Sequence, residues 1–258
     1  MKYPKHINVP TERVKTLAST NDYLAELCKQ GKAEEFYTVI AEDQTDGKGQ
    51  RGNSWESEPG KNLTFSIVLY PTAIEANKQF HLSMLASIAI IDTLTDYTDG
   101  FSIKWPNDIY WHDKKICGIL IENELEGQYL SQSIIGIGLN INQTEFLSSA
   151  PNPVSLYQII GKEIDKDEVF SKIIHALLGG YKALEDNLIE ASSCISHLYK
   201  KFLYRKDDFH LYQDKDGTFE ARIHDVGHDG YLYLEDTGNN IRKYAFKEIT
   251  YIIHEQRE

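Results

Sequence analysis

The sequence predicts an α+β protein in which a mixed or antiparallel sheet packs against helices, followed by a small β-barrel. Segments with the helical spacing of apolar residues alternate with strand-like segments up to about residue 201. After Phe202 the helical period disappears, and short alternating strands are separated by turn sequences. We therefore predict an α+β domain over residues 1–204 and a small C-terminal β domain over residues 205–258.

The first predicted helix begins at Ser19, a residue type that caps helix N-termini, and ends before Gly31. A strand is expected at 36–41. Residues 43–61 form a long polar loop, and long loops inside compact domains are usually functional or disordered. The pattern further predicts strands at 62–70, 101–105, 109–111, 115–124 and 129–142, and helices at 81–97, 167–187 and 189–201.

Composition limits the function classes. The net charge of −12 argues against a protein that coats nucleic acid, which requires clustered Lys and Arg. The three cysteines are far apart and form no CxxC pair, as expected for reduced thiols in the cytoplasm. No apolar run is long enough to span a bilayer, and the N-terminus does not resemble a signal peptide. We expect a cytoplasmic protein without a nucleic-acid or membrane partner.

The loop at 47–52 matches the pattern GxGxxG, but a dinucleotide-binding loop should open a helix, and Pro59 and Gly60 follow instead. A flexible loop with backbone N–H groups, Lys48 and Arg51 can fold over a phosphate. A mobile surface hairpin is the alternative. Trp55 could stack on a base or close a pocket, or belong to the ordinary core.

Two lysines occupy the ends of neighbouring predicted strands, around a turn at 104–108. Lys104 and Lys115 can each place a positive charge on a phosphate or carboxylate, although lysines at strand ends also serve solubility. Asn107 and Asp108 are common turn residues, and Asp108 could help to hold Mg²⁺ beside substrate phosphates. Gly118 would let a ligand approach the backbone closely.

The strand at 136–142 contains two glycines among apolar residues. Such glycines usually have a packing or ligand-binding reason. Asn140 both donates and accepts hydrogen bonds, as recognition of a purine edge requires. The pattern therefore extends the predicted site across this strand.

Together these motifs resemble the catalytic region of the biotin–protein ligases. The resemblance spans about half of the chain, and its most specific part is 104–108 followed by 115–120. It implies a class II synthetase-like fold shared with lipoate ligases, and an SH3-like C-terminal domain. It also implies a ligase that forms a C–N bond, biotin–[acetyl-CoA-carboxylase] ligase. In its two steps, biotin is activated with ATP to biotinyl-5′-AMP and transferred to a lysine of a carrier domain.

The resemblance also implies roles for individual residues. Lys115, bridging the biotin carboxylate and the α-phosphate, and Arg51 would be catalytic, and Asp108 would serve the metal. Biotin would be bound by Ser19, Thr20, Asn21, Gln44, Gly47, Gly118, Gly136 and Gly138. The nucleotide would be bound by Lys48, Gly49, Gln50, Arg51, Gly52, Trp55, Lys104, Asn107 and Asn140.

ATP, Mg²⁺ and biotin are the implied ligands, with no tightly bound prosthetic group. The implied partner is a biotin carboxyl carrier protein, and a homodimer is left open. Ser19 lies too near the start for the N-terminal DNA-binding domain of some relatives, so a monofunctional ligase is expected. Many relatives carry arginines in place of Lys48 and Gln50. We therefore expect either that the adenylate is retained less strongly or that Arg51 contributes more to its retention.

Three alternatives remain at this level. A lipoate– or octanoate–protein ligase shares the fold, but 19–21 and 104–108 favour biotin. A non-catalytic biotin sensor would not need Lys115 and the glycine loop. A globular protein with a surface glycine loop leaves the spaced motifs unexplained.

Overall fold

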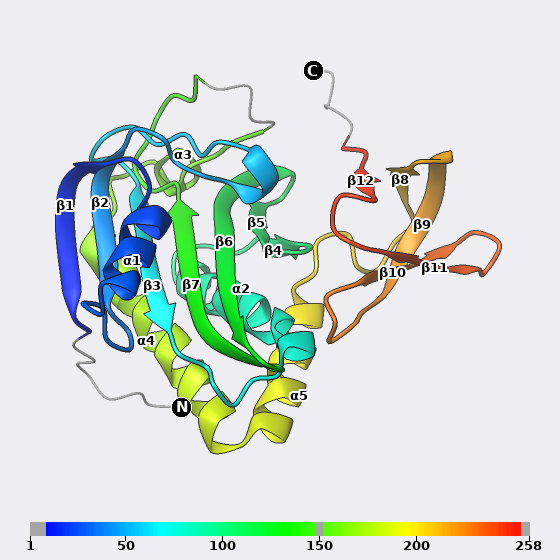
Figure 1. Ribbon diagram of the computed structural model, residues 1–258. Helices are drawn as coiled ribbons and strands as arrows, with labels where there is room; N and C mark the ends of the chain where they lie inside the picture. Colours follow the sequence, from blue (N-terminus) through cyan, green and yellow to red (C-terminus); the bar gives the residue numbers. More distant parts are fainter. Residues whose placement is uncertain (1–8, 148–151, 254–258) are drawn as a thin grey trace.

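The structure is a computed structural model that describes residues 9–147 and 152–253. Figure 1 shows a main body built on a seven-stranded sheet with helices on both faces. A five-stranded antiparallel sheet stands beside this body and is formed by the C-terminal part of the chain. The predicted α+β class and the separate β region after Phe202 are confirmed.

The seven-stranded sheet has the order β1-β2-β3-β7-β6-β5-β4. Only β1 and β2 are parallel, because α1 carries the chain between them, and the remaining pairs are antiparallel. The strands are β1 (Thr11–Leu17), β2 (Thr38–Gln44), β3 (Leu63–Leu69), β4 (Phe101–Lys104), β5 (Asp108–Trp111), β6 (Lys114–Glu126) and β7 (Tyr129–Leu139). The sheet is therefore mixed, as predicted.

The helices divide unequally between the two faces of this sheet. Figure 1 shows α1 (Thr20–Lys29) on one face, where it contacts β2, β3 and β7. The other face is covered by α2 (Phe80–Thr95), α4 (Lys166–Asp186) and α5 (Leu188–Lys201), which pack against one another. Because strand side chains alternate, Phe65 joins the large core under these helices, whereas Val68 packs under α1. Part of the α1 face is left for a site.

Two elements were missed by the sequence pattern. Strand β1 lies at the edge of the sheet, and its side chains are alternately exposed and half-buried, so its sequence carries few apolar residues. Helix α3 (Leu156–Ile160) has little more than one turn, but a capping box of Ser155 and Gln158 defines its start. The predicted helices at 81–97, 167–187 and 189–201 are confirmed, with ends shifted by at most two residues.

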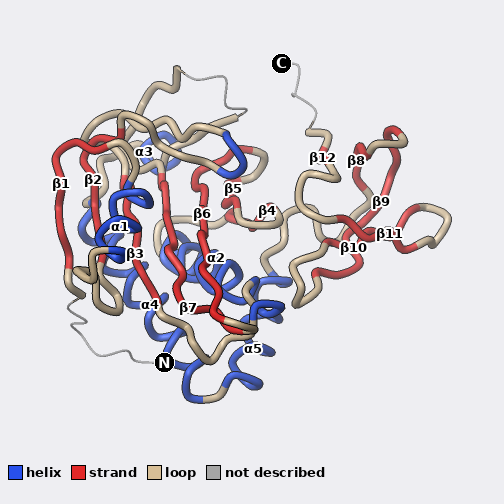
Figure 2. Tube along the Cα trace, viewed as in Figure 1, coloured by secondary structure: helices blue, strands red, loops and turns tan. Residues whose placement is uncertain are grey.

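The C-terminal sheet has the order β11-β10-β9-β8-β12 and packs on the main body (Figure 2). The segment that leads from the main body into this sheet is anchored to β4. There, Ile103 exchanges backbone hydrogen bonds with Phe202 and Tyr204 at 2.7 and 2.9 Å. The indole N–H of Trp105 donates to the carbonyl of Gly230 at 3.0 Å. The strands are β8 (His210–Asp214), β9 (Gly217–Val226), β10 (Leu232–Asp236), β11 (Ile241–Tyr244) and β12 (Thr250–Tyr251).

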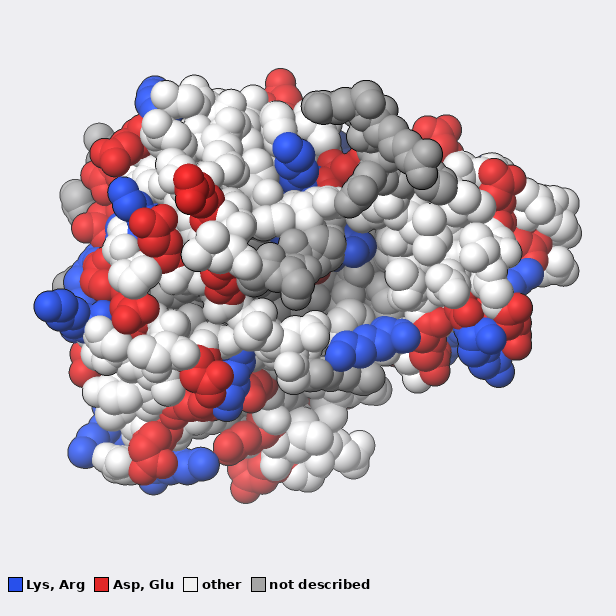
Figure 3. Space-filling model, turned by 90° about the horizontal axis from the view of Figure 1, so that it is seen from above, with Lys and Arg blue, Asp and Glu red and all other residues white. Residues whose placement is uncertain are grey.

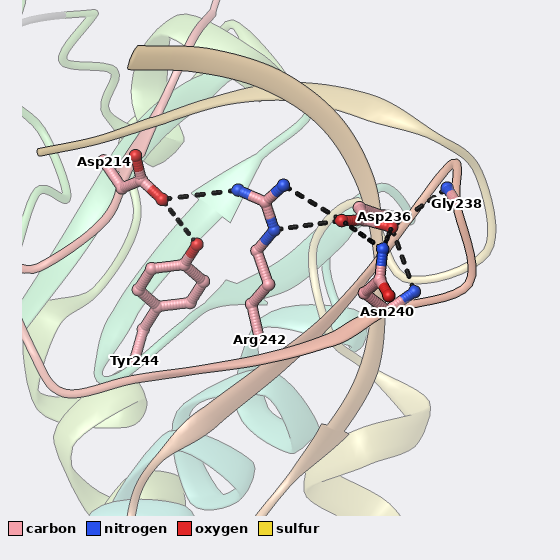
Figure 4. A network of polar contacts seen from close by, with 6 residues as sticks. All are labelled: Asp214, Asp236, Gly238, Asn240, Arg242 and Tyr244. Carbon is pink, nitrogen blue, oxygen red and sulfur yellow. Dashed lines mark hydrogen bonds and ion pairs between the residues drawn. The ribbon is translucent and has the colours of Figure 1, made fainter. Parts of the chain in front are cut away.

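A polar network closes the β10–β11 turn of this sheet (Figure 4). Asp236 accepts hydrogen bonds from the backbone N–H groups of Gly238 and Asn240 at 2.9 and 3.0 Å. Arg242 donates to the other carboxylate oxygen of Asp236, at 2.9 Å from its terminal nitrogen, and lies 3.6 Å from Asp214. These bonds lower the pKa of Asp236, first through Asn240 N–H and also through Arg242. The network stabilises the turn far from the main sheet.

On the face seen in Figure 3, the C-terminal sheet projects to one side of the main body, and basic side chains are interspersed with acidic ones. Among the described residues, no helix combines the length and the hydropathy that crossing a membrane requires.

Candidate active site

The floor of the site is a patch of small and polar residues on the α1 face of β3, β7 and β6. In one row across the sheet, Thr64, Gly138 and Gly118 lie side by side, and the next row begins with Ser66 and Gly136. All five positions share a face because strand side chains alternate. Without Cβ atoms, Gly118 and Gly138 let the Trp55 ring lie close to the backbone, and Gly136 does the same for the Asn21 amide. The close approach of a ligand to these glycines stays a prediction.

A cavity of about 120 Å³ lies above this floor, between the start of α1 and the glycine loop. It collects most of the residues that the sequence motifs singled out, although they are up to 119 positions apart. These are Ser19, Thr20, Asn21, Gln44, Lys48, Gly49, Gln50, Trp55, Asn107, Asp108, Lys115, Gly118, Gly136 and Gly138. The remaining lining residues are Asn53, Ser54, Ile119, Leu120, Ile137 and Phe246.

One end of the cavity is polar and tightly hydrogen-bonded. Ser19 caps α1, and the backbone N–H of Thr20 donates to Gln44 Oε1 at 2.8 Å. Asn21 donates from Nδ2 to the Glu122 carboxylate at 2.7 Å, and its Oδ1 lies 2.6 Å from the Ser66 hydroxyl. Each side chain is therefore held in one orientation, which suits recognition of a polar ligand group.

Trp55 lies flat against the glycine floor. A Cβ atom added at Gly138 would lie 2.4 Å from its indole ring, and one at Gly118 would lie 3.1 Å from it. The backbone N–H of Trp55 donates to the carbonyl of Gly47 at 2.7 Å, which ties the ring to the glycine loop. Its buried Nε1 has no hydrogen-bond partner in the described part of the chain. A polar ligand atom would satisfy this donor.

The ammonium group of Lys115 lies at the edge of the glycine floor. The Lys115 ammonium forms an ion pair with Asp108 at 2.7 Å, with both side chains about one quarter exposed, and lies 5.8 Å from the Trp55 ring centre. Asn107 is buried and donates from Nδ2 to the carbonyl of Ile119 in the neighbouring strand. The turn therefore holds its acidic residue against Lys115, and an anion in the cavity would meet this lysine directly.

Lys104 lies outside this cavity. It borders a neighbouring cavity that also includes Asp108 and Tyr251, and its ammonium donates to the Tyr110 hydroxyl at 3.1 Å. Burial lowers the pKa of Lys104, against the opposing effect of Asp108. The two lysines of the motif are thus separated, and nucleotide binding by Lys104 stays a prediction.

Asn140 is also outside the cavity lining. Its Nδ2 donates to the carbonyl of Val154 at 3.1 Å, while its buried Oδ1 has no partner among the described residues. The amide therefore anchors the segment that follows β7, and recognition of adenine by Asn140 stays a prediction.

The glycine loop folds over the cavity as a short hairpin with a 3₁₀ turn, η1 (Gln50–Gly52). The Lys48 ammonium pairs with Asp22 at 2.6 Å, and this hydrogen bond raises the pKa of the lysine. Gly52 has φ +85°, a conformation that favours glycine. The side chain of Arg51 lies outside what the structure describes, so its predicted catalytic role stays a prediction.

Sequence reasoning missed Ser66 and Phe246. Ser66 is a fully buried polar residue of β3 in the polar end of the site, and no motif includes it. Phe246 comes from the C-terminal region, and its ring centre lies 6.1 Å from that of Trp105. Only the fold brings Phe246 to the cavity and Ser66 to the hydrogen-bond network beside it, although a serine at a core-like strand position is a signal that the sequence contains.

No cluster of three or more His, Cys, Asp or Glu side chains suited to a metal ion occurs within the described ranges 9–147 and 152–253. The glycine floor, the polar end and the lysine at the rim instead define a site for a small molecule that carries an anionic group.

Comparison with known proteins agrees with this description. The profile of the biotin/lipoate A/B protein ligase family matches residues 14–140. The bifunctional ligase/repressor BirA of Bacillus subtilis (strain 168) is 32% identical over 88% of this chain and 69% of its own length. The biotin–[acetyl-CoA-carboxylase] ligase of Paracoccus denitrificans is 31% identical over 50% of this chain and 56% of its own length.

The fold is shared with the biotin protein ligase from Aquifex aeolicus, whose structure was solved in complex with biotin and ATP. The TM-score is 0.76 at 24% sequence identity, over 93% of this chain and 97% of that chain. The chain belongs to the biotin/lipoate A/B protein ligase family.

Proposed function

We propose that the protein activates biotin with ATP to biotinyl-5′-AMP and transfers the biotinyl group to a lysine of a carrier protein. The observation that carries this proposal is the cavity itself, in which the polar end at Thr20 and Gln44 and the cation of Lys115 share one glycine floor. An elongated acid with a polar ring fits this layout, because its ring meets the polar end and its carboxylate meets the lysine.

In the first step, an oxygen of the biotin carboxylate attacks the α-phosphorus of ATP. A C–O–P linkage forms, the bond between the α-phosphorus and its bridging oxygen breaks, and pyrophosphate leaves. Both reacting groups are anionic, so a cation between them lowers the barrier. At 4 Å, a unit charge pair contributes roughly 4 kcal/mol at an effective dielectric constant of 20. Lys115 is placed for this role, because its ammonium is at the cavity rim with only Asp108 as an ion-pair partner among the described residues.

In the second step, the neutral amine of the carrier lysine attacks the carbonyl carbon of the mixed anhydride. An amide C–N bond forms, the C–O bond to AMP breaks, and the amine loses a proton. The adenylate must be protected from water until the carrier arrives. The glycine loop and Trp55 are suited to this protection, because they lie over the cavity and are joined by the Trp55–Gly47 hydrogen bond.

The proposal includes Mg²⁺, which proteins usually hold through one or two carboxylates plus substrate phosphates. Asp108 supplies one carboxylate at the cavity, so the donor set fits a metal held mainly by phosphate oxygens. When bound, Mg²⁺ would neutralise phosphate charge. Asp108 itself also orients Lys115 through their ion pair.

We further propose a biotin carboxyl carrier domain as the partner and the cytoplasm as the location, in line with three free cysteines. The predicted domain boundary near residue 205 is supported by the two elements on either side of it. Phe202 and Tyr204 still hydrogen-bond to the main sheet, whereas β8, the first strand of the C-terminal sheet, begins at His210. Phe246 at the cavity supports a role of the C-terminal sheet in covering the nucleotide or meeting the carrier.

The test is ATP–pyrophosphate exchange with Mg²⁺, run in parallel with biotin, lipoate and octanoate. Exchange that depends on biotin alone is the expected result. Exchange only with lipoate or octanoate would assign the protein to the other branch of the family. Tight biotin binding without exchange would identify a sensor.

A further inference from the structure

The turn between β4 and β5 carries the acidic partner of Lys115. Residues 105–107 connect Lys104 to Asp108, which face each other in the register of the two strands. Asp108 is the first residue of β5, and its carboxylate holds the Lys115 ammonium at 2.7 Å. The place of this ammonium at the cavity edge therefore depends on where the turn holds Asp108.

Two of the helices that cover the sheet face opposite α1 hold this turn by its Pro106 carbonyl. The hydroxyl of Tyr199 in α5 donates to this oxygen at 2.8 Å, and the hydroxyl of Ser83 in α2 donates to it at 3.4 Å. Proline has no backbone N–H group, so the carbonyl is the one backbone group through which Pro106 can be hydrogen-bonded. The bond from Tyr199 is the shorter and therefore the stronger of the two.

The Tyr199 hydroxyl is a fixed donor. Its side chain is fully buried, and its ring packs edge-on against Phe80, with 5.6 Å between the ring centres. Burial raises the pKa of Tyr199 well above its ordinary value, and the Asp108 carboxylate raises it further. The hydroxyl therefore keeps its proton and continues to donate to the turn. Tyr199 does not line the active-site cavity, so an effect on the reaction has to pass through the turn.

We propose that Tyr199 is a positioning residue for the first step of the reaction, acting on Lys115 through the Pro106 carbonyl and Asp108. Only Asn107 separates Pro106 from Asp108, so a shift of the carbonyl reaches Asp108 along a very short piece of chain. A displacement of about 1 Å at a catalytic group is enough to slow a reaction markedly, because the reacting geometry is lost. This inference rests on the proposed function and deepens it.

The first variant is Tyr199→Phe, which removes one oxygen and keeps the ring that packs against Phe80. The kcat of biotin-dependent ATP–pyrophosphate exchange should fall about tenfold, as expected for one lost hydrogen bond. The KM for biotin should stay unchanged, because Tyr199 and Pro106 are both outside the cavity lining. Urea denaturation of each variant sets the conditions under which all of them are folded.

Two further variants separate positioning from general packing. Ser83→Ala removes the longer bond to the same carbonyl and should lower kcat less than Tyr199→Phe does. Tyr212→Phe is the matched control, because Tyr212 is also fully buried but its hydroxyl has no hydrogen-bond partner in the described part of the chain. This control should leave exchange unchanged.

A double-mutant cycle with Asp108→Asn tests the path of the effect. If Tyr199 acts through Asp108, Tyr199→Phe should have little further effect on kcat once Asp108 has been replaced. A merely structural role would instead multiply the two losses, because independent effects add as free energies.

A wild-type kcat in Tyr199→Phe would overturn this inference and leave the proposed function intact. A loss in Ser83→Ala as large as that in Tyr199→Phe would overturn it as well, and so would an undiminished loss in the Asp108→Asn background. If wild type shows no exchange with biotin, the proposed function fails, and this inference fails with it.

Discussion

The two faces of the seven-stranded sheet are made by the same strands but have opposite character. Under α2, α4 and α5, residues such as Phe65 and Ile135 form a close-packed apolar core without exposed surface. On the α1 face, the adjacent residues of the same strands are Ser66 and Gly136, which lie in the active-site floor. Since strand side chains alternate, one face can provide stability while the other retains space and polar groups for chemistry.

This comparison predicts that substitutions on the two faces separate activity from stability. A change on the floor should affect catalysis or ligand affinity with little effect on unfolding. A change on the helix-covered face should do the reverse. The following predictions test this separation in order of decreasing effect.

Lys115→Ala should cause the largest loss of activity, a decrease in biotin-dependent ATP–pyrophosphate exchange of about 100- to 1,000-fold, as for removal of one group that stabilises transition-state charge. The reason is that the variant lacks the ammonium group at the cavity rim. Among the described residues, Lys115 is the only cation that forms an ion pair with Asp108. Lys114→Ala is the matched control, because its exposed side chain is the preceding residue of β6, and it should retain full exchange. Equal losses in both variants would refute the assignment.

Ile135→Ala, on the opposite face, should lower the free energy of unfolding by about 2–5 kcal/mol, the usual cost of truncating a buried aliphatic side chain. Ile135 is fully buried in the large core. Urea denaturation measures the loss, and the KM for biotin should be unchanged below the unfolding transition. A raised KM without loss of stability would contradict the division between the faces.

Gly138→Ala should raise the KM for biotin and ATP about tenfold, equivalent to 1.4 kcal/mol of binding free energy. The added methyl group would lie 2.4 Å from the indole ring of Trp55, which must therefore move. Steady-state exchange kinetics measure the effect. The double variant with Trp55→Phe provides the check, because a smaller ring should relieve the clash and recover part of the loss. No recovery would show that Trp55 is not the affected neighbour.

Asp236→Asn should produce the smallest effect and leave exchange unchanged, because the network of Figure 4 lies in the C-terminal sheet. The pKa of Asp236 is lowered below its ordinary value of 3.8 in the folded state. The ionised carboxylate therefore contributes stability above this value, and the contribution is lost as the pH falls through the folded-state pKa.

Thermal unfolding should consequently show wild type to be more stable than Asp236→Asn at pH 7, with the difference shrinking in acid below pH 3.8. A difference that grows toward low pH would contradict the assigned direction of the pKa shift.

Most of the site could be predicted from the sequence, because its residues occur in short motifs whose chemistry is visible locally. The glycines at 118, 136 and 138 and the lysine at 115 needed only the alternation of strand side chains to come together. The sequence did not predict the residues that reach the site only through packing between segments far apart in the chain. Phe246 reaches the cavity through the docking of the C-terminal sheet. Ser66 reaches the polar network beside the cavity through the register of β3 with β7.

The fold shows the same limit. The long helices have strong apolar periods and were predicted nearly to their ends, whereas edge strand β1 and short helix α3 were missed. Lys104 illustrates a different limit, because its motif is correct but its side chain turns toward Tyr110 and away from the cavity. A motif identifies the residue types, but the direction of each side chain depends on the surrounding packing.

The most direct test of the account is a crystal structure of the protein with biotin, Mg²⁺ and a non-hydrolysable ATP analogue. The account predicts that biotin lies against Gly118, Gly136 and Gly138, with its ureido ring at Thr20 and Gln44 and its carboxylate beside Lys115. Biotin bound elsewhere, such as in the cavity beside Lys104, would contradict it.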